Sequence, residues 1–382
     1  MGRDCIMKID LGRLATASVI ALAGAAVATP AAAQKIENQY VCVFNPGLVG
    51  KGQVKAEANR SARAAGANVK FTYERTIRGF AVNAAPQAVA KMQANNPRIA
   101  YCEQDQVYSV SAPPPGKGPG GGGNDGGSQP SESTPWGVTR VGGGQTGATG
   151  RALVIDSGVD LDHPDLNVDV SLAANFTRDK DADDGNGHGT HVAGTIAAIK
   201  GNGIGVVGVA PGVTVVGIKV LDRRGSGSTS GVIAGIEYAA SIANSDDVAN
   251  MSLGGGFSQA LNDAVIAAAQ GGLEFALAAG NESTSATTKS PASANHPNIY
   301  TISSFAQGDN WSSFSNYGNP PVDYAQPGSS ILSTYKGGGY ATLSGTSMAS
   351  PHMAGLLLLG TPRSGGSVNG DPDGNPDTIG IN

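Results

Sequence analysis

The chain has 382 residues, enough for about two or three domains, and 40% of them are hydrophobic, which allows a sizeable buried core. The formal net charge of −5 at pH 7 is too mild to favour nucleic acid or an anionic membrane surface as a partner. Glycine is frequent, with 57 residues, so many tight turns and close backbone approaches are expected.

The N-terminal segment has the pattern of an export signal. Arg3, Lys8 and Arg13 precede an apolar run over residues 14–28, and Ala-Ala-Ala then offers a small-residue cleavage site. The alternative is a retained membrane anchor, but the apolar run is too short to span a bilayer comfortably. We therefore expect a signal peptide over residues 1–33 and secretion, either to the extracellular space or to the periplasm.

Residues 34–111 are expected to form a small domain. Strand-like and helix-like segments follow one another in the order β-α-β-β-α-β, a ferredoxin-like α+β arrangement. In that topology the first and last strands are neighbours, and they carry Cys42 and Cys102. These two cysteines form either a cross-strand disulfide or a pair of buried free thiols, and the sequence leaves both open.

The composition changes twice after this domain. Residues 112–134 are rich in Pro, Gly and Ser and are predicted to be a linker, because such a segment cannot pack a core. Residues 135–382 alternate short apolar runs with stretches of helical spacing. This alternation predicts an α/β domain with a mostly parallel sheet and helices on both faces. Ligands of such sheets bind beyond the carboxyl ends of the strands.

Three segments of this domain carry the parts of a nucleophilic centre. Asp156 ends a predicted strand in VIDSGVDLDHPDL, while His188 and Ser347 start predicted helices in NGHGTHVAGT and SGTSMASPH. Taken singly, they would be a solvated aspartate, a histidine beside glycines and a helix N-cap. Together they fit acyl transfer, because a serine nucleophile needs a base and the base needs an anion to orient it.

These motifs, in the order Asp, His, Ser, resemble the subtilisin (subtilase) family of serine proteases over residues 135–359. The segments YVCVF, GFAV and YCEQDQ of the first domain resemble the family's inhibitor-type propeptide. The resemblance implies a subtilisin-like fold in which Ser347 attacks the substrate, His188 is the general base and Asp156 orients His188. It also implies a monomeric serine endopeptidase that processes itself and whose propeptide is both chaperone and inhibitor.

The motifs also allow two other interpretations. His188 and His191 form an H-x-x-H pair that could hold zinc, but no Glu completes H-E-x-x-H, and His191 is expected to face the core. Gly187 and Gly189 are expected to keep the approach to the His188 ring clear. An α/β-hydrolase esterase would need its histidine well after the serine, where the chain has only a histidine five residues on.

The resemblance also assigns residues around the nucleophile. Asn281 follows a buried strand, and its amide and the backbone N–H of Ser347 would form the oxyanion hole, although a turn-forming role is the alternative. Substrate is expected to bind as an added strand beside two glycine-containing segments. The implied contact residues are Gly225, Ser226, Gly227, Ser252, Leu253, Gly254 and Gly280. Their small side chains and lack of acidic groups predict broad specificity with a preference for large apolar residues before the cut.

Calcium is an expected structural cofactor. Asp165 and the loop over residues 199–206 match family calcium ligands, and Glu132 stands where the family has a Gln. The implied ligand set combines carboxylate, amide and carbonyl oxygens, which suits Ca²⁺: Asp165, Ile199, Asn202, Ile204 and Val206. The acidic segments DKDADD and DPDGNPD are instead interpreted as solvated loops, and the second lacks the Glu that closes an EF-hand.

The chain departs from the family pattern at two places, the expected start of the mature enzyme and the C-terminal segment. The family pattern would start the mature enzyme near Ser131, but Pro130 before it is a poor cleavage site. The chain after Leu359 looks irregular instead of forming the usual C-terminal helices. The different-class alternative is a catalytically silent secreted binding protein on the same fold.

Overall fold

The computed structural model describes residue 1, residues 34–110 and residues 130–382. The predicted signal peptide and most of the predicted linker lie outside the described residues. Within the described part, we found no helix that is both long and apolar enough to cross a membrane.

Residues 34–110 form the expected α+β domain, here called the N-terminal domain. Its elements are β1 (Lys35–Phe44), η1 (Lys51–Gln53), α1 (Val54–Ala64), β2 (Asn68–Tyr73), β3 (Gly79–Asn83), α2 (Pro86–Asn95) and β4 (Ile99–Ser109). The strand order is β2-β3-β1-β4, so the first and last strands are neighbours as the pattern predicted. Cys42 lies opposite Cys102 in this register, and the structure joins them by a disulfide with their Cα atoms 4.0 Å apart.

Residues 130–382 form the C-terminal domain, an α/β domain. Its helices are α3 (Trp136–Arg140), η2 (Val170–Leu172), α4 (His188–Ala197), α5 (Thr229–Ile242), α6 (Gln259–Gln270), η3 (Ala286–Thr288) and α7 (Thr346–Leu359). Its longer strands are β5 (Ala152–Asp156), β8 (Thr214–Lys219), β10 (Val248–Met251), β12 (Glu274–Ala278), β14 (Ile299–Ala306), β16 (Val322–Pro327), β17 (Ile331–Tyr335), β18 (Gly339–Leu343), β19 (Arg363–Ser367) and β20 (Thr378–Ile381). Its short strands are β6 (Asn167–Val168), β7 (Ala174–Asn175), β9 (Ser226–Ser228), β11 (Gly255–Gly256), β13 (Lys289–Ser290) and β15 (Asn310–Trp311).

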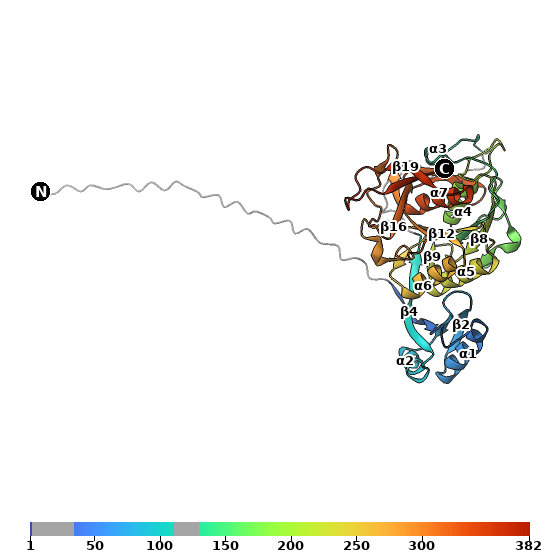
Figure 1. Cartoon of the computed structure of the whole chain (residues 1–382), viewed down its shortest axis with the longest axis vertical. Helices are drawn as coiled ribbons and strands as arrows, with labels where there is room; N and C mark the ends of the chain where they lie inside the picture. The colour runs from blue at the N-terminus through green and yellow to red at the C-terminus, as the bar shows by residue number, and fades with distance from the viewer. Residues whose placement is uncertain (2–33, 111–129) are drawn as a thin grey trace. The chain divides into compact units, whose positions relative to one another are not determined.

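The main sheet of this domain is mostly parallel and has helices on both faces, as predicted. The strand order runs β19-β20-β16-β14-β12-β10-β5-β8-β6, and the neighbours from β20 to β6 are parallel. Helices α4 and α7 pack together on one side, and α5 and α6 on the other (Figure 1). Strand β5 contributes to both layers, because Leu153 and Ile155 join the α5/α6 core while Ala152 and Val154 join the α4/α7 core.

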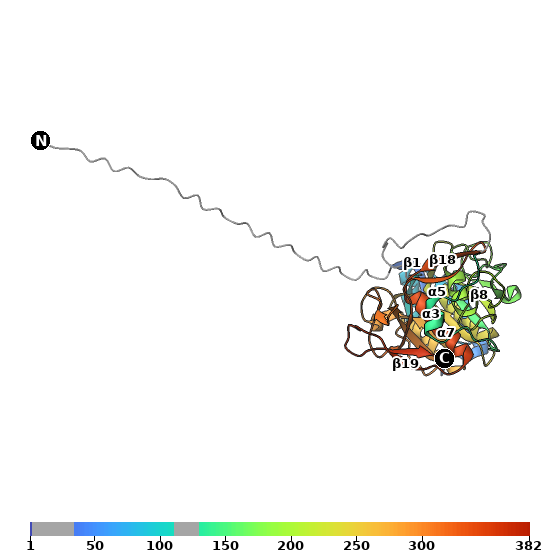
Figure 2. The same cartoon turned by 90° about the horizontal axis from the view of Figure 1, so that it is seen from above.

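The chain after Leu359 corrects the expectation of an irregular tail. Strands β19 and β20 form an antiparallel pair, and β20 joins β16 in parallel, so the tail extends the main sheet (Figure 2). Ile379 is fully buried beside Phe305 and Ala325. The sequence of β19, RSGGS, lacks the apolar residues that would predict a strand. β19 forms because it pairs with β20, and β20 is in turn held by the distant strand β16.

The start of the C-terminal domain lies close to the predicted linker boundary. Ser131 and Ser133, which the boundary at residue 135 leaves in the linker, form bridges to Ile204 and Val206. The domain limits themselves stay a prediction.

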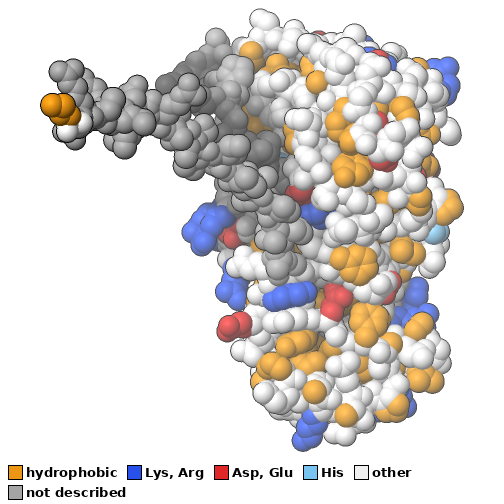
Figure 3. All heavy atoms as spheres, turned by 90° about the vertical axis from the view of Figure 1, so that its left-hand side faces the viewer, with side chains coloured by type: hydrophobic (Ala, Val, Ile, Leu, Met, Phe, Trp, Pro, Cys, Tyr) orange, Lys and Arg blue, Asp and Glu red, His pale blue; other side chains and the backbone are white. Residues whose placement is uncertain are grey.

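On the face drawn in Figure 3, acidic and basic side chains lie singly among polar and apolar ones.

Candidate active site

The three predicted catalytic residues lie at the ends of neighbouring elements. Asp156 is the last residue of β5, His188 is the first residue of α4, and Ser347 is the second residue of α7. All three are buried, with relative exposures of 0%, 7% and 1%. His188 follows Asp156 by 32 positions and Ser347 follows His188 by 159 positions. The elements that carry them are neighbours in space, because α4 and α7 pack against each other and against β5.

Asp156 and His188 are in direct contact. The distance from His188 Nδ1 to Asp156 Oδ1 is 2.8 Å, and the same oxygen accepts the backbone N–H of Ser157 at 2.7 Å. Burial alone lowers the pKa of His188, but the charge and hydrogen bond of Asp156, with a further contribution from Asp184, outweigh burial and raise it above 6.5. Among the described residues, His188 Nε2 has no hydrogen-bond partner, so this nitrogen is available to a proton donor.

Ser347 is held by the end of β10. Its Oγ donates to the carbonyl oxygen of Ser252 at 3.0 Å, and its own carbonyl accepts from Ser252 Oγ at 2.8 Å. Asn250 extends this network, because its amide donates to Ser252 Oγ and accepts from Ser350 Oγ, both at 2.8 Å.

Asn281, the predicted oxyanion-hole residue, is bonded to the residue that directly precedes Ser347. Its Oδ1 accepts the N–H and the hydroxyl of Thr346 at 2.8 and 2.9 Å. Thr346 Oγ1 in turn accepts the N–H of Gly280 at 3.0 Å. Thr346 thus fixes the Asn281 side chain beside the start of α7, and the role of Asn281 in an oxyanion hole stays a prediction. Sequence reasoning missed Thr346, although it directly precedes the nucleophile.

The residues around His188 confirm one expectation and correct another. His191 is fully buried, its Nε2 lies 3.0 and 3.1 Å from the carbonyls of Ile331 and Ala341, and burial lowers its pKa to about 3. These contacts are structural. The glycines beside His188 serve packing: a Cβ on Gly189 would lie 2.0 Å from a backbone oxygen, and Gly187 has φ +106° and abuts the Tyr335 ring.

The two predicted substrate segments flank the end of β4. Val107, Tyr108 and Ser109 pair with β9 in antiparallel register, and the N–H of Val110 donates to the carbonyl of Gly225 at 2.9 Å. On the other side, Ser109 forms a bridge with Gly254. The N-terminal domain thus contributes a strand between residues 225–228 and 252–255.

The side chain of Tyr108 packs against the backbone of β11, at the end of the second of these segments. It is fully buried, and its hydroxyl donates to the carbonyl of Gly256 at 2.6 Å. A Cβ on Gly255 would lie 2.9 Å from its ring, so the glycine allows the ring to lie flat against the backbone. Leu253 is buried in the α5/α6 core, whereas a Cβ on Gly280 would meet the Asn316 amide.

The predicted calcium residues gather around Asp165. This carboxylate is fully buried and accepts from Asn202 Nδ2 at 2.7 Å, from the Val206 N–H at 3.0 Å and from the Tyr340 hydroxyl at 3.3 Å. Burial raises its pKa, against these hydrogen bonds. Glu132 accepts the N–H groups of Gly201 and Gly203 from the same loop. The described residues contain no cluster of three or more His, Cys, Asp or Glu side chains suited to a metal.

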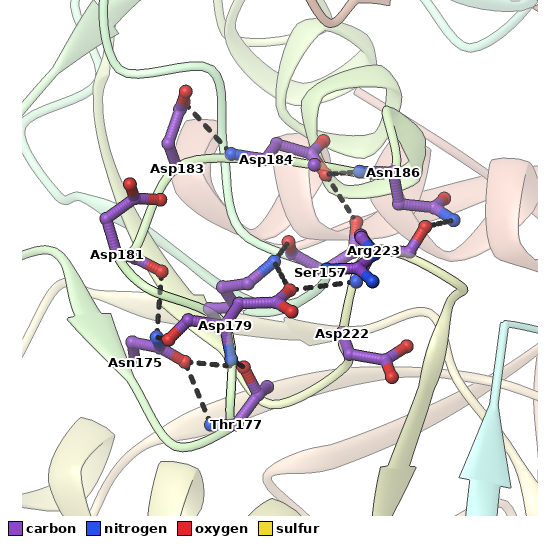
Figure 4. Close-up of polar contacts among 12 residues, drawn as sticks. Ser157, Asn175, Thr177, Asp179, Asp181, Asp183, Asp184, Asn186, Asp222 and Arg223 are labelled. Carbon is purple, nitrogen blue, oxygen red and sulfur yellow. Dashed lines mark hydrogen bonds and ion pairs between the residues drawn. The ribbon is translucent and has the colours of Figure 1, made fainter.

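The acidic segments are not simply solvated loops, which corrects the sequence interpretation. In the first, Asp184 is only 4% exposed and Asp179 lies 3.2 Å from the buried ammonium of Lys219, so both carboxylates bind within the protein (Figure 4). In the second, Asp377 is 1% exposed and accepts from Ser303 Oγ. Burial is the main cause that raises the pKa of Asp377, to about 6.

Comparison with known proteins identifies the family. Residues 153–362 match the model described as the subtilase family. A subtilisin-like protease 7 of Arthroderma gypseum is 38% identical over 393 residues, covering 93% of this chain and 92% of the relative. An alkaline serine exoprotease A of Vibrio alginolyticus is 38% identical over 349 residues, covering 85% of this chain and 60% of the relative.

A solved structure agrees with this assignment. The crystal structure of a cold adapted subtilisin-like serine proteinase matches with a TM-score of 0.54 and 42% identity, covering 60% of this chain and 87% of that one. The chain belongs to the subtilase family, and it is a subtilisin-like serine endopeptidase.

Proposed function

We propose that the protein is a secreted serine endopeptidase whose catalytic triad is Asp156, His188 and Ser347. The observation that carries this proposal is the 2.8 Å contact between Asp156 and His188, together with a buried Ser347 at the start of α7, the helix that packs against α4. Ser347 Oγ attacks the scissile carbonyl and gives its proton to His188 Nε2. Asp156 holds the tautomer of His188 and stabilises the imidazolium that forms.

The remaining steps follow from the surrounding donors. Asn281 Nδ2 and the Ser347 N–H stabilise the oxyanion of the tetrahedral intermediate, and loss of one such donor typically costs about 3–4 kcal/mol. His188 then protonates the leaving amine, and the acyl-enzyme forms. A water molecule deprotonated by His188 attacks the ester, which releases the product acid and restores Ser347.

The N-terminal domain is proposed to be the inhibitor and folding chaperone of the enzyme. Two of its carboxylates lie at helix starts of the C-terminal domain: Glu103 accepts the N–H of Gln259 at 3.1 Å, and Asp105 accepts the N–H of Ser230 at 3.1 Å. Negative charge is favourable there because the helix N-terminus carries unpaired donors and a positive dipole end. These contacts support docking of the N-terminal domain on α5 and α6.

The same contacts support self-processing. The end of β4 occupies the cleft as a substrate strand would, and a tethered strand has a high effective concentration there. An antiparallel chain that continued past Val110 in this register would next come beside Ser252, whose carbonyl binds Ser347 Oγ. We therefore expect the first cut within about two residues of Val110, with any N-terminus near Ser131 arising from a later cut.

The finer properties are part of the same proposal. Secretion rests on the N-terminal sequence pattern, which lies outside the described residues. The preference for large apolar residues before the cut, and a monomeric state, rest on the family resemblance. Asp165, Asn202 and Glu132, with the carbonyls of residues 199–206, would hold Ca²⁺, which would supply a cross-link between loops. The carboxylates of Asp165 and Glu132 are ligands of the kind that Ca²⁺ takes, and both accept N–H groups from the loop over residues 199–206.

The test uses a fluorophosphonate probe and the variant Ser347→Ala. The wild-type enzyme is expected to be labelled at Ser347 and to lose residues 34–110. Ser347→Ala, expressed alone, is expected to remain unlabelled and to accumulate as a precursor that keeps them. If Ser347→Ala matured at the wild-type rate without another protease, the proposal would be wrong, and a folded but unlabelled wild type would favour the silent binding protein.

A further inference from the structure

Asp184 lies between the two elements that carry Asp156 and His188. Its carboxylate is buried and accepts five hydrogen bonds. Oδ1 accepts from Ser157 Oγ at 2.9 Å and from the N–H groups of Asn186 and Gly187 at 3.0 and 2.9 Å (Figure 4). Oδ2 accepts from the N–H and the hydroxyl of Thr190 at 2.9 and 2.6 Å.

These bonds fix the start of α4, which has no cap of its own. The N-cap residue is Gly187, which lacks a side chain. The first N–H groups of the helix are instead taken by side chains from outside it: Gly189 donates to Ser157 Oγ at 2.9 Å, and Thr190 donates to Asp184. A carboxylate at this position caps the helix and is favoured by the helix dipole, so it fixes where His188 begins.

Ser157 connects the same carboxylate to Asp156. Its N–H donates to Asp156 Oδ1 at 2.7 Å, and its hydroxyl donates to Asp184 while accepting from Gly189. Its carbonyl accepts from the buried Lys219 Nζ at 2.6 Å. The N–H, the hydroxyl and the carbonyl of Ser157 are therefore all hydrogen-bonded. Together these bonds hold the end of β5 in place relative to α4.

We propose that Asp184 is a positioning residue for the triad: through Ser157 and the first turn of α4 it holds Asp156 and His188 in their 2.8 Å contact. This inference rests on the proposed function, because it assigns a role relative to that triad. Asp184 touches neither the substrate segments nor Ser347, so its contribution belongs to the geometry of the base and not to substrate binding.

The test is Asp184→Asn, measured in the matured enzyme. An amide has one acceptor oxygen in place of two, so it cannot accept on both sides of the network. We expect kcat to fall about 10–100-fold, the size of effect that a misplacement of about 1 Å produces. KM for a peptide substrate should stay unchanged. The NMR signal of the His188 Nδ1 proton, which a general loss of stability would not move, should shift or broaden.

The pH profile gives a second readout. The acidic limb of kcat/KM should move to lower pH in Asp184→Asn, because the lost negative charge favoured the protonated imidazole. The other ionisable groups that act on His188, namely Asp156 and His191, stay in place. Asp181→Asn is the matched control, because it removes one exposed carboxylate from the same loop and should leave kcat, KM and the limb unchanged.

Ser157→Ala keeps the inference testable if Asp184→Asn does not fold. It removes the hydroxyl that links the two sides and should also lower kcat at unchanged KM. If both variants fold, the double variant should lose less than the two single losses combined. Wild-type kcat in Asp184→Asn, or in Ser157→Ala where only that variant folds, would overturn the inference, as would a change confined to KM. An inactive wild type would instead contradict the proposed function.

Discussion

Ser109 and Gly254 exchange two backbone hydrogen bonds, from the Ser109 N–H to the Gly254 carbonyl at 3.2 Å and back from the Gly254 N–H at 3.1 Å. This exchange is the closed ring of an antiparallel pair. It ties the last strand of the N-terminal domain to the segment that ends beside Ser347, since Ser252 lies two residues before Gly254. The N-terminal domain and Ser347 are thus connected through one short run of backbone.

The first prediction concerns Tyr108, whose ring lies buried beside this pair. In the uncleaved Ser347→Ala precursor, Tyr108→Ala should destabilise the contact between the domains by about 3–5 kcal/mol, as for other buried aromatic truncations. Tyr108→Phe keeps the ring and removes two hydrogen bonds of the hydroxyl, the one donated to the Gly256 carbonyl and the one accepted from Gln106 Nε2 at 3.1 Å, so it should cost about 1–3 kcal/mol. Limited proteolysis of the precursor measures both. Equal resistance of Tyr108→Ala and the parent would show that the ring does not hold the strand.

The second prediction concerns the pH dependence of activity. His188 must be neutral to accept the proton of Ser347, and Asp156 helps to raise its pKa above the ordinary value of about 6.5. A raised pKa keeps the imidazole protonated to higher pH, so kcat/KM should fall on acidification through a limb that lies above about 6.5. The profile is measured with a peptide substrate that does not titrate in this range. A flat profile across it would exclude His188 as the base.

Much of this site could be predicted from sequence because its chemistry sits at element ends. Apolar runs that are buried on both faces mark the strands of a parallel sheet, and Asp156, His188 and Ser347 each stand where such an element ends or begins. The disulfide could not be decided in the same way. It depends on the register that puts Cys42 opposite Cys102, and a shift of one residue would have turned the two side chains to opposite faces.

Other features were beyond the sequence because distant residues determine them. Asp184 stands in an acidic run that looks solvated, and only the packing of α4 against the end of β5 buries it. Strand β19 lacks alternating apolar residues and forms because β20 offers it an edge. The glycines beside His188 are expected from sequence to keep the approach to its ring clear, whereas their packing depends on neighbours from distant segments, Gly158 and Tyr335.

The third prediction concerns calcium at Asp165. If the ion binds only the folded enzyme, chelation removes stabilisation that amounts to about 2.7 kcal/mol when calcium is at 100 times its Kd. For a domain of this size that corresponds to a melting temperature lower by roughly 5–10 °C. Asp165→Asn should melt at the same temperature with and without chelator. Calorimetry of both proteins in Ca²⁺ and in EDTA is the measurement, and a wild type that ignores EDTA would remove the site from the proposal.

The last prediction concerns Glu237, which lies on α5 and faces the N-terminal domain. Its carboxylate accepts the N–H groups of Glu74, Arg75 and Thr76 at 2.8, 2.7 and 2.9 Å, and the Thr76 hydroxyl at 2.8 Å. One charged side chain therefore binds the whole turn over residues 74–76 of the N-terminal domain. Glu237 is distant in sequence from the three predicted catalytic residues. Among the described residues, no hydrogen bond or ion pair joins it to them.

Glu237→Ala should therefore separate inhibition from catalysis. The loss of hydrogen bonds to a charged group, about 1.5–3 kcal/mol, corresponds to a roughly 10–150-fold weaker hold on the N-terminal domain. The domain should leave sooner after the first cut, so activity appears earlier, while kcat/KM of the matured enzyme stays at the wild-type value. A time course of activity and of the released domain measures both. Lys289→Ala, which removes a partly buried ammonium paired with Glu282, serves as the control and should follow the wild-type time course. Unchanged release in Glu237→Ala would mean that the turn over residues 74–76 does not contribute to retention, whereas reduced activity of the matured enzyme would mean that Glu237 also supports the catalytic domain.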